Sequence, residues 1–519
     1  MSVSMLMRAA VVVALFGVVS RFLGLGREMV LAAVYGNSGS ADAFVNALNI
    51  VNVISAILLY VMVTVVIPAF TAEQEREGEA SAWSLAWAIT GWMSLFVIAM
   101  ATVIAVFPEA PAALFRLDPE RAAITRDLIR IMAPALLFQG ISAMFTALLQ
   151  IHGKFGVPAA VGTAFNLGII AGVVAGQQHL GIEAAAWGVS AGALFQVLLQ
   201  LPQFLRVARA EGTRPRMTHP RLGAIALSAA PIVGASAMQQ LNSFTDRFFA
   251  SSLEPGRVAA LSYANSLGAA PRAALLIPLM TPLFPFVARV VAQGRDREAV
   301  RGISRVAGLL ALVAVPASLL LAVYARETTQ LLLGRGKCDA GCVTETTGPM
   351  VFYALALLGN FLSVFFNRTM AAAQLQSAIL VATSTTVVIT IVFDIILLGP
   401  MEQSGLAAAS AVGVYCQLLM YVFVLRRRFP DLDVRRLGHR QAVLLGAGGA
   451  IIAVAFAMDR VLPTDDLKGW SLVGPLGAKV ALALLAYLAV VRIVARPELT
   501  EATGAIRSVV RRKPTSAAG

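Results

Sequence analysis

Residues 20–28, Ser-Arg-Phe-Leu-Gly-Leu-Gly-Arg-Glu, place three ionisable side chains inside an apolar segment that runs from about Ala9 to Tyr35. As a helix this segment would be roughly 40 Å long, which is enough to cross a membrane. Ionisable groups at membrane depth cost free energy unless they face a water-filled cavity or a partner. The segment therefore predicts a membrane-spanning helix whose Arg21 and Arg27 face a polar cavity.

Two further features of this segment bear on function. Gly24 and Gly26 each weaken a helix by about 1 kcal/mol relative to alanine, which favours bending or opening, as in transporters with broken helices. For Arg27 and Glu28 an alternative is open, because long side chains can extend their polar ends to a membrane interface. Arg21 follows a longer apolar run, so this alternative suits it less well.

The composition indicates an integral membrane protein. The chain has 519 residues, of which 58% are hydrophobic and 13% are charged, whereas soluble domains have about 25% charged residues. Apolar runs long enough to cross the membrane recur along the whole chain, so we predict an all-α polytopic fold with no separate soluble domain. The net charge of +13 comes from basic residues in short loops, which is typical of topology signals and not of nucleic-acid binding.

We predict about fourteen membrane-spanning helices. They are expected near residues 8–35, 42–70, 82–107, 128–151, 157–177, 183–205, 222–250, 258–290, 301–324, 349–372, 376–399, 405–425, 441–458 and 471–495. Arginines concentrate in one alternating set of loops, which we place in the cytoplasm together with both termini. The first apolar run is too long for a signal peptide and is expected to remain as the first span.

The basic loop at residues 206–221 divides the predicted spans into two halves. We expect an N-lobe at 1–205, a linker at 206–221, a C-lobe at 222–425, a basic loop at 426–440, two further spans at 441–496 and a tail at 497–519. Asn166 in the fifth span and Asp394 in the eleventh occupy similar settings, a weak internal symmetry of the kind found in duplicated transporters.

Polar residues at membrane depth are the candidates for function. Besides those of the first span, they are Asp42, Asp246, Arg247, Arg272, Asp394 and Lys479. Asp246 and Arg247 point about 100° apart on a helix and need not pair, and they could instead be an outer-end pair stabilised by headgroups. We expect the Lys479 amine to extend to an interface.

The sequence contains no catalytic or cofactor motif, and we predict that the chain is not an enzyme. Its four histidines lack metal-ligand spacing, no Walker A sequence is present, and Gly-Leu-Gly at 24–26 lacks the third glycine of a dinucleotide site. Cys338 and Cys342 share one loop and could form a local disulfide if that loop faces an oxidising compartment. A cavity with several fixed arginines suits an anionic, phosphate-bearing ligand.

Three blocks of sequence resemble a known family. They are the Ser20–Glu28 segment, then Gly36 with Ala41-Asp42-Ala43-Phe44, and the stretch from Leu149 to Ala159 followed by Asn166. In these blocks the chain is similar to the MurJ (MviN) family of lipid-linked oligosaccharide flippases, within the multidrug, oligosaccharidyl-lipid and polysaccharide exporter superfamily. The resemblance implies two six-helix lobes around a central cavity, plus two C-terminal helices whose groove takes a polyprenyl tail.

The resemblance also implies the cargo and its binding residues. Arg21, Arg27 and Asp42 match cavity and gate residues of the motif, with Glu28 as a gate residue or partner. The expected cargo is undecaprenyl-pyrophosphate-linked lipid II, moved from the cytoplasmic to the periplasmic leaflet of the bacterial inner membrane by alternating access. Cell-wall synthesis proteins are expected partners, and no cofactor is expected.

The chain departs from the family pattern in two spans. The family's second-span P-N-x-x-R reads Val-Asn-Val-Ile-Ser at 51–55 here, and the eighth-span R-x-x-E before a proline is Ser266 and Ala269 before Pro271. Arg247 and Arg272 would supply positive charge from other positions, so the cargo could be a different lipid-linked glycan.

Four oxygen-bearing residues resemble the sodium site of some family members. They are Asp394, Thr390 one turn earlier, Ser410 in the next span, and Asp246. Hard oxygen ligands suit such an ion, so sodium or the membrane potential is the expected driving force.

Two other classes of function remain as alternatives. The first is a cation-coupled multidrug antiporter of the same superfamily, with Asp246 or Asp394 as the coupling carboxylate. Its cavity would be acidic or apolar, whereas the first and eighth spans here are basic. The second is a scaffold without transport activity in an envelope-synthesis complex.

Overall fold

The structure is a computed structural model that describes residues 3–210, 217–464, 467 and 469–494. Its contacts divide the chain into two compact units. The first unit comprises Met1–Ser266 together with Arg335–Cys342, and the second comprises Leu267–Gly334 together with Val343–Gly519. Each unit is built from helices, and the predicted all-α class is confirmed for the described residues.

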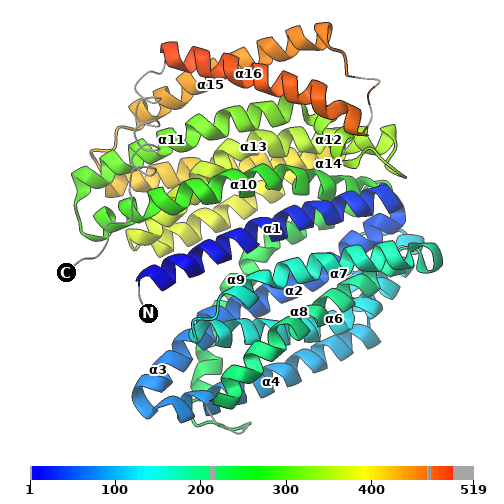
Figure 1. The fold of residues 1–519 in the computed structure, drawn as a ribbon, viewed down its shortest axis with the longest axis vertical. Coiled ribbons are helices and arrows are strands. Elements are labelled where there is room, and N and C mark those ends of the chain that lie inside the picture. The colour runs from blue at the N-terminus through cyan, green and yellow to red at the C-terminus, as the bar shows by residue number, and fades with distance from the viewer. Residues whose placement is uncertain (1–2, 211–216, 465–466, 468, 495–519) are drawn as a thin grey trace. The chain divides into compact units, whose positions relative to one another are not determined.

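The first unit contains nine α-helices and the starts of α10 and α13 within its described part. They are α1 (Val3–Tyr35), α2 (Gly39–Val61), α3 (Ile67–Glu77), α4 (Glu79–Val106), α5 (Glu109–Ala112), α6 (Pro119–Ile151), α7 (Gly156–Leu180), α8 (Glu183–Ala210), α9 (Leu222–Ala250) and the beginnings of α10 (Arg257–Ala292) and α13 (Ala340–Ala372). A π-helical turn at Met62–Val66 joins α2 to α3, so this span is continuous. In Figure 1, α6, α7 and α8 run side by side.

Small residues allow α7 and α8 to approach closely. A Cβ atom on Gly168 would lie 2.2 Å from the Cα of Gly192, and one on Gly172 would lie 2.5 Å from the Cα of Gly188. Glycines spaced four residues apart on each helix permit such contact between backbones, as is common in membrane helix pairs. This crossing supports the face of α7 that packs on α1.

The second unit contains the remainder of α10 and the later helices, with α13 from Val343 onward. They are α11 (Asp296–Val323), α12 (Ala325–Leu333), α13 (Ala340–Ala372), α14 (Gln376–Arg428), α15 (Val434–Val461) and α16 (Val473–Val494), with a 3₁₀ turn at Gly469–Leu472. In Figure 1, α15 and α16 lie side by side. They contact α11, and Ile303, Leu444 and Tyr487 belong to the shared buried core.

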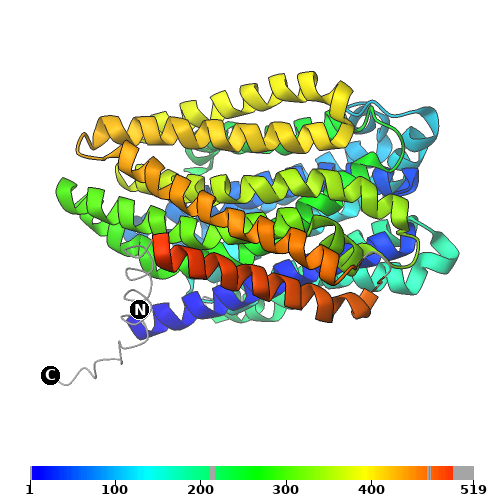
Figure 2. The ribbon, with the colours of Figure 1, turned by 90° about the horizontal axis from the view of Figure 1, so that it is seen from above.

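The long helix α14 contains two of the predicted spans. Its backbone leaves the helical region at Glu402, with φ 50° and ψ −132°, and the two halves fold back on each other. A Cβ atom on Gly413 in the second half would lie 2.3 Å from Thr390 Oγ1 in the first. Figure 2 shows both halves, in yellow and light orange, running side by side.

Every predicted span overlaps a helix of the structure. Among the described residues, ten helices are long and apolar enough to cross a membrane, or eleven if the bent helix α10 counts as one span. The total of fourteen crossings stays a prediction. The boundary between the two units lies in α10, and the predicted linker at 206–221 is described only at its two ends. The tail at 497–519 lies outside the described residues, and the division into six-span lobes stays a prediction.

The expectation for Lys479 is wrong. Its side chain is buried, and the amine donates to Asp459 Oδ1 at 2.6 Å and to Thr464 Oγ1 at 3.0 Å. Glu327 Oε1 lies 3.9 Å away. Two acidic groups from other elements offset the desolvation cost of the buried amine, because a charge that is paired in the interior no longer needs water. Lys479 therefore joins α16 to α15 and α12 and does not extend to solvent.

Candidate functional site

Arg27 is held at the contact between α1 and α7. Its Nη1 donates to Asn166 Oδ1 at 3.3 Å, and its Nη2 lies 2.5 Å from Glu28 Oε1. Asn166 in turn donates its Nδ2 to the carbonyls of Ser20 at 3.1 Å and Gly162 at 3.0 Å. The Asn166 side chain on α7 therefore binds both the α1 backbone and the Arg27 guanidinium. The Arg27 side chain is 16% exposed in this position.

Arg21 lies in a different environment from Arg27. The two residues are six positions apart, which places them about 120° apart around the helix. The Arg21 side chain is exposed and has no hydrogen bond or ion pair within the part of the chain that the structure describes. Glu28, by contrast, is buried, with 4% exposure. Within the described residues, α1 thus carries one guanidinium without a partner and one that is held by Asn166 and Glu28.

Asp42 is buried at the start of α2 and binds the N-terminus of α10. Its Oδ1 accepts a hydrogen bond from the Ala259 N–H and its Oδ2 accepts one from the Gly256 N–H, both at 2.7 Å. The first N–H groups of a helix have no partners within it, and a carboxylate there also complements the helix dipole. Asp42 therefore fastens the beginning of α10 to α2 within the first unit.

Arg121 completes this contact. Its Nη1 lies 3.4 Å from Asp42 Oδ2, and its Nη2 donates to the Leu253 carbonyl at 3.1 Å. Its Nε donates to Asp118, which also caps α6 by accepting from the Arg121 N–H at 2.8 Å. The backbone and side-chain hydrogen bonds from Arg121 lower the pKa of the Asp118 carboxyl from its ordinary value. One arginine thus joins α2, α6 and the loop between α9 and α10.

The turn between α1 and α2 is held by two other segments of the first unit. Gly36 has φ 63°, and a Cβ atom there would lie 2.7 Å from the Lys337 carbonyl oxygen, so only glycine suits this turn. The Tyr263 hydroxyl donates to the Gly36 carbonyl at 2.9 Å. The Lys337 N–H donates to the Ala33 carbonyl at 2.8 Å. We call this set of contacts, together with those of Asp42 and Arg121, the α10 clasp.

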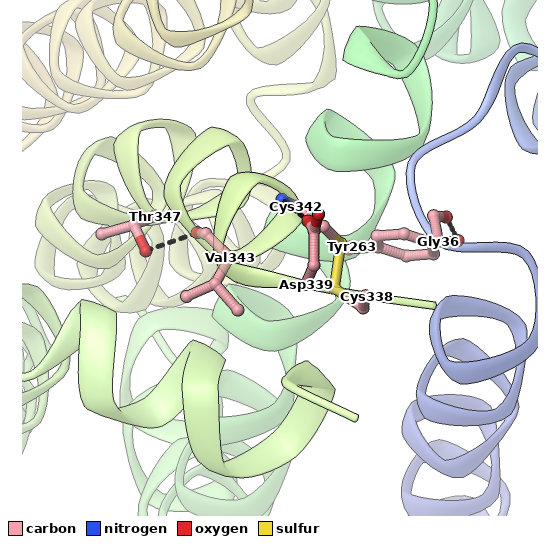
Figure 3. The surroundings of a disulfide bond; sticks show 7 residues. All are labelled: Gly36, Tyr263, Cys338, Asp339, Cys342, Val343 and Thr347. Carbon is pink, nitrogen blue, oxygen red and sulfur yellow. Dashed lines mark hydrogen bonds between the residues drawn. A yellow bond between two sulfur atoms is a disulfide. The ribbon is translucent and has the colours of Figure 1, made fainter. Parts of the chain in front are cut away.

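A disulfide closes the segment that holds the turn. Cys338 and Cys342, whose pairing the sequence leaves open, are bonded, and the Cys342 N–H donates to Asp339 Oδ1 at 3.0 Å. Figure 3 shows the disulfide next to Tyr263, whose hydroxyl reaches Gly36. The bond restricts the conformations of the loop that contacts the end of α1.

The remaining predicted arginines belong to different compact units of the chain. Asp246 and Arg247 are half-buried on α9 in the first unit, whereas Arg272 is half-buried on α10 in the second unit. Arg272 Nη1 donates to Asn360 Oδ1 on α13 at 3.4 Å. The convergence of Arg21, Arg27, Arg247 and Arg272 on one cavity stays a prediction.

Three of the predicted sodium ligands lie on the two halves of α14. Asp394 and Thr390 are buried, and Ser410 is half-buried three residues before the Gly413 that packs on Thr390. Thr390 Oγ1 has no hydrogen-bond partner among the described residues. Such hard oxygen donors fit sodium. No cluster of three or more His, Cys, Asp or Glu with metal-site geometry occurs in the described ranges.

Sequence reasoning did not identify several residues of these contacts. Arg121 follows Asp118 by three positions at the start of a helix, a spacing that predicts local capping and gives no sign of the more distant Asp42. Tyr263 and Asn360 lie in apolar spans, where a single polar side chain could have marked a helix contact.

The chain matches known proteins over most of its length. The profile of the family described as "Lipid II flippase MurJ" matches residues 31–472. The lipid II flippase MurJ of Burkholderia cenocepacia is 26% identical, covering 82% of this chain and 84% of that protein. A probable lipid II flippase MurJ of Rhizobium meliloti is 25% identical, with 85% and 84% covered.

Solved structures show the same fold. A lipid II flippase MurJ in an inward closed conformation has a TM-score of 0.79 at 18% identity, covering 94% of this chain and all of that one. An inward-facing multidrug resistance MATE transporter of the MOP superfamily has a TM-score of 0.66 at 10% identity, with 80% and 95% covered. The family profile covers far more than half of the sequence. The chain therefore belongs to the lipid II flippase MurJ family.

Proposed function

We propose that this chain transports lipid II from the cytoplasmic to the periplasmic leaflet by alternating access. As a family member with many apolar helices, it is a multi-pass protein of the bacterial inner membrane and a transporter, not an enzyme. The observation that carries the proposal is the pair of arginines on α1, because Arg21 has an exposed guanidinium and Arg27 is braced by Asn166.

The two arginines have different roles in this proposal. Arg21 binds a pyrophosphate oxygen directly, since a planar guanidinium donates paired hydrogen bonds to phosphate. Arg27 keeps its orientation through Asn166 and Glu28, so its remaining donors are fixed before the cargo arrives. Fixing a binding group in advance lowers the entropy lost on binding.

The α10 clasp supplies a closed state that must open during the cycle. Asp42 and Arg121 hold the start of α10 to α2 and α6, and release of these bonds would free the start of α10. We assign this end of the helices to the periplasm, because the opposite loops carry most arginines. Both termini are then cytoplasmic, and the Cys338–Cys342 disulfide lies where oxidation is possible.

The remaining parts of the proposal concern the cargo's tail, the driving force and the partners. The undecaprenyl chain would follow the α15–α16 pair. Sodium held by Asp394, Thr390 and Ser410, or the membrane potential, would bias the direction of transport. Sodium would supply a charge that couples ion entry to movement, and the buried oxygen of Thr390 supports this assignment. Cell-wall synthesis proteins would take up the product.

A second cargo is favoured by the residues that depart from the family pattern. Ser55, Ser266 and Ala269 stand where the family motif has charged side chains, so a differently charged glycan headgroup is the alternative. Complementation of a bacterial strain depleted of its own lipid II flippase separates the two. We expect rescue by the wild-type chain, with Arg21→Ala at equal membrane abundance failing to rescue. Correct insertion without rescue by the wild type would overturn the lipid II assignment.

A further inference from the structure

The second unit contains a basic cavity whose lining includes no residue of the proposed cargo site. Its volume is about 370 Å³, which falls within the range of ligand pockets, about 300 to 1,000 Å³. The cavity lies between the start of α11, the α14–α15 loop and the start of α15. Its lining includes Arg301 and Arg305 of α11 and Arg436 and Arg440 of α15. None of these residues belongs to the predicted cargo site.

The fold brings these four arginines together in spite of their repulsion. Each pair is spaced four residues apart, so its members lie on one face of a helix, where like charges are destabilising. Buried Ile303 on α11 and Leu437 on α15 belong to one apolar core that holds the two helices in contact. The packing of that core therefore fixes two pairs of positive charges around a common space.

Acidic groups at the cavity only partly offset this charge. Asp431 and Asp433 also line it, so its six charged side chains leave an excess of two positive charges. Asp433 Oδ1 accepts a hydrogen bond from the Arg436 N–H at 2.9 Å and so serves as the cap of α15. The guanidinium groups of Arg305 and Arg436 form no ion pair with a carboxylate in the described part of the chain. The cavity is thus suited to an anion.

We propose that this cavity binds the phosphate of an anionic lipid headgroup. Both α11 and α15 are candidate membrane spans, and the cavity lies within their first three turns, near one end of each candidate span. Lipid headgroups contact membrane helices near such ends. Guanidinium groups pair with phosphate through two parallel hydrogen bonds. Basic pockets between membrane helices attract anionic lipids in this way. The bound lipid would neutralise the charges of the α11–α15 contact.

The test measures lipid binding by two charge-matched variants. Native mass spectrometry of the full-length, delipidated chain, titrated with phosphatidylglycerol, gives an apparent Kd. The Arg305→Gln/Arg436→Gln variant removes two charges from the cavity and should bind roughly thirtyfold more weakly. The Arg289→Gln/Arg297→Gln variant removes the same charge from the neighbouring basic surface. It should bind within about threefold of wild type, because exposed charges are screened by salt.

Two further arms identify the source of the phosphate and guard against misfolding. Phosphatidylcholine, which has no net charge, should bind more weakly than phosphatidylglycerol, and inorganic pyrophosphate should bind with a higher apparent Kd than phosphatidylglycerol. Single Arg305→Lys and Arg436→Lys variants keep the charge but lose the paired donors, so each should weaken binding several-fold while the protein stays folded. Tighter binding of pyrophosphate than of phosphatidylglycerol would overturn the lipid assignment in favour of a soluble anion. Equal loss of binding in both double variants would refute a built site.

Discussion

Replacing Asp42 by asparagine should release the start of α10 while leaving most of the first unit intact. The carboxylate accepts two backbone N–H bonds at 2.7 Å and lies 3.4 Å from Arg121 Nη1. An amide keeps one acceptor oxygen, but its NH₂ group would face either the Gly256 or the Ala259 N–H. The variant also leaves Arg121 without its buried carboxylate partner.

The magnitude follows from these contacts. A hydrogen bond to a charged group contributes about 1.5 to 3 kcal/mol, and a carboxylate at a helix N-terminus adds about 0.3 to 1 kcal/mol. Loss of one such bond and of the charge should therefore cost about 2 to 4 kcal/mol in the local opening free energy. This corresponds to a roughly thirty- to several-hundredfold larger open population.

Hydrogen–deuterium exchange of the peptide that covers residues 253–262 measures this opening directly. We expect exchange to accelerate by the same factor in Asp42→Asn, with little change in peptides from α7 and α8. Asp127→Asn is the control, because it removes one negative charge from an exposed position on α6. Unchanged exchange at the start of α10 in a folded Asp42→Asn protein would refute the clasp.

Four further predictions concern the arginines, their support, the buried lysine and the disulfide. Arg21→Ala and Arg27→Ala should insert normally yet lose one to two decades of cargo affinity, with Arg21→Lys intermediate. A flipping assay normalised to membrane abundance checks this prediction. Loss of activity that follows loss of protein would contradict it. Asn166→Ala should lower flipping about tenfold by freeing Arg27, while Asn166→Asp should restore it in part, and equal loss in both would argue against positioning through the amide oxygen. Asp459→Ala should lower the thermal midpoint of unfolding more than Lys479→Met does. Asp459→Ala leaves the buried Lys479 amine with only the more distant Glu327, whereas methionine fills the space of the lysine without a charge. The reverse order would show that the Lys479–Asp459 pair is not important for stability. The double variant Cys338→Ser/Cys342→Ser should lower the free energy of unfolding by about 2 kcal/mol, as expected when a disulfide closes so short a loop. Hydrogen–deuterium exchange should increase only at residues 335–342. Unaltered exchange there would show that the bond does not restrain the loop.

The helices of this protein are predictable from sequence because a membrane enforces a local rule. Each span must be long, apolar and internally hydrogen-bonded, so a short window of residues is enough to recognise it. Every predicted span overlaps a helix for this reason. The bend at Glu402 separates two predicted spans that the structure joins in α14. Charge at membrane depth also makes Arg21, Arg27 and Asp42 candidates for function without any knowledge of their neighbours, and their roles stay predictions.

The partners of these charges depend on contacts that no local window contains. Asp42 binds N–H groups more than 200 residues away in the sequence, with a separation of 217 for Ala259, and Arg27 reaches Asn166 across 139 residues. Lys479 was expected at an interface because its own helix is apolar, yet Asp459 and Glu327 come from other elements and stabilise it in the interior. Hydropathy along one helix measures the cost of burying a charge, and only the packing of several helices supplies the group that offsets that cost.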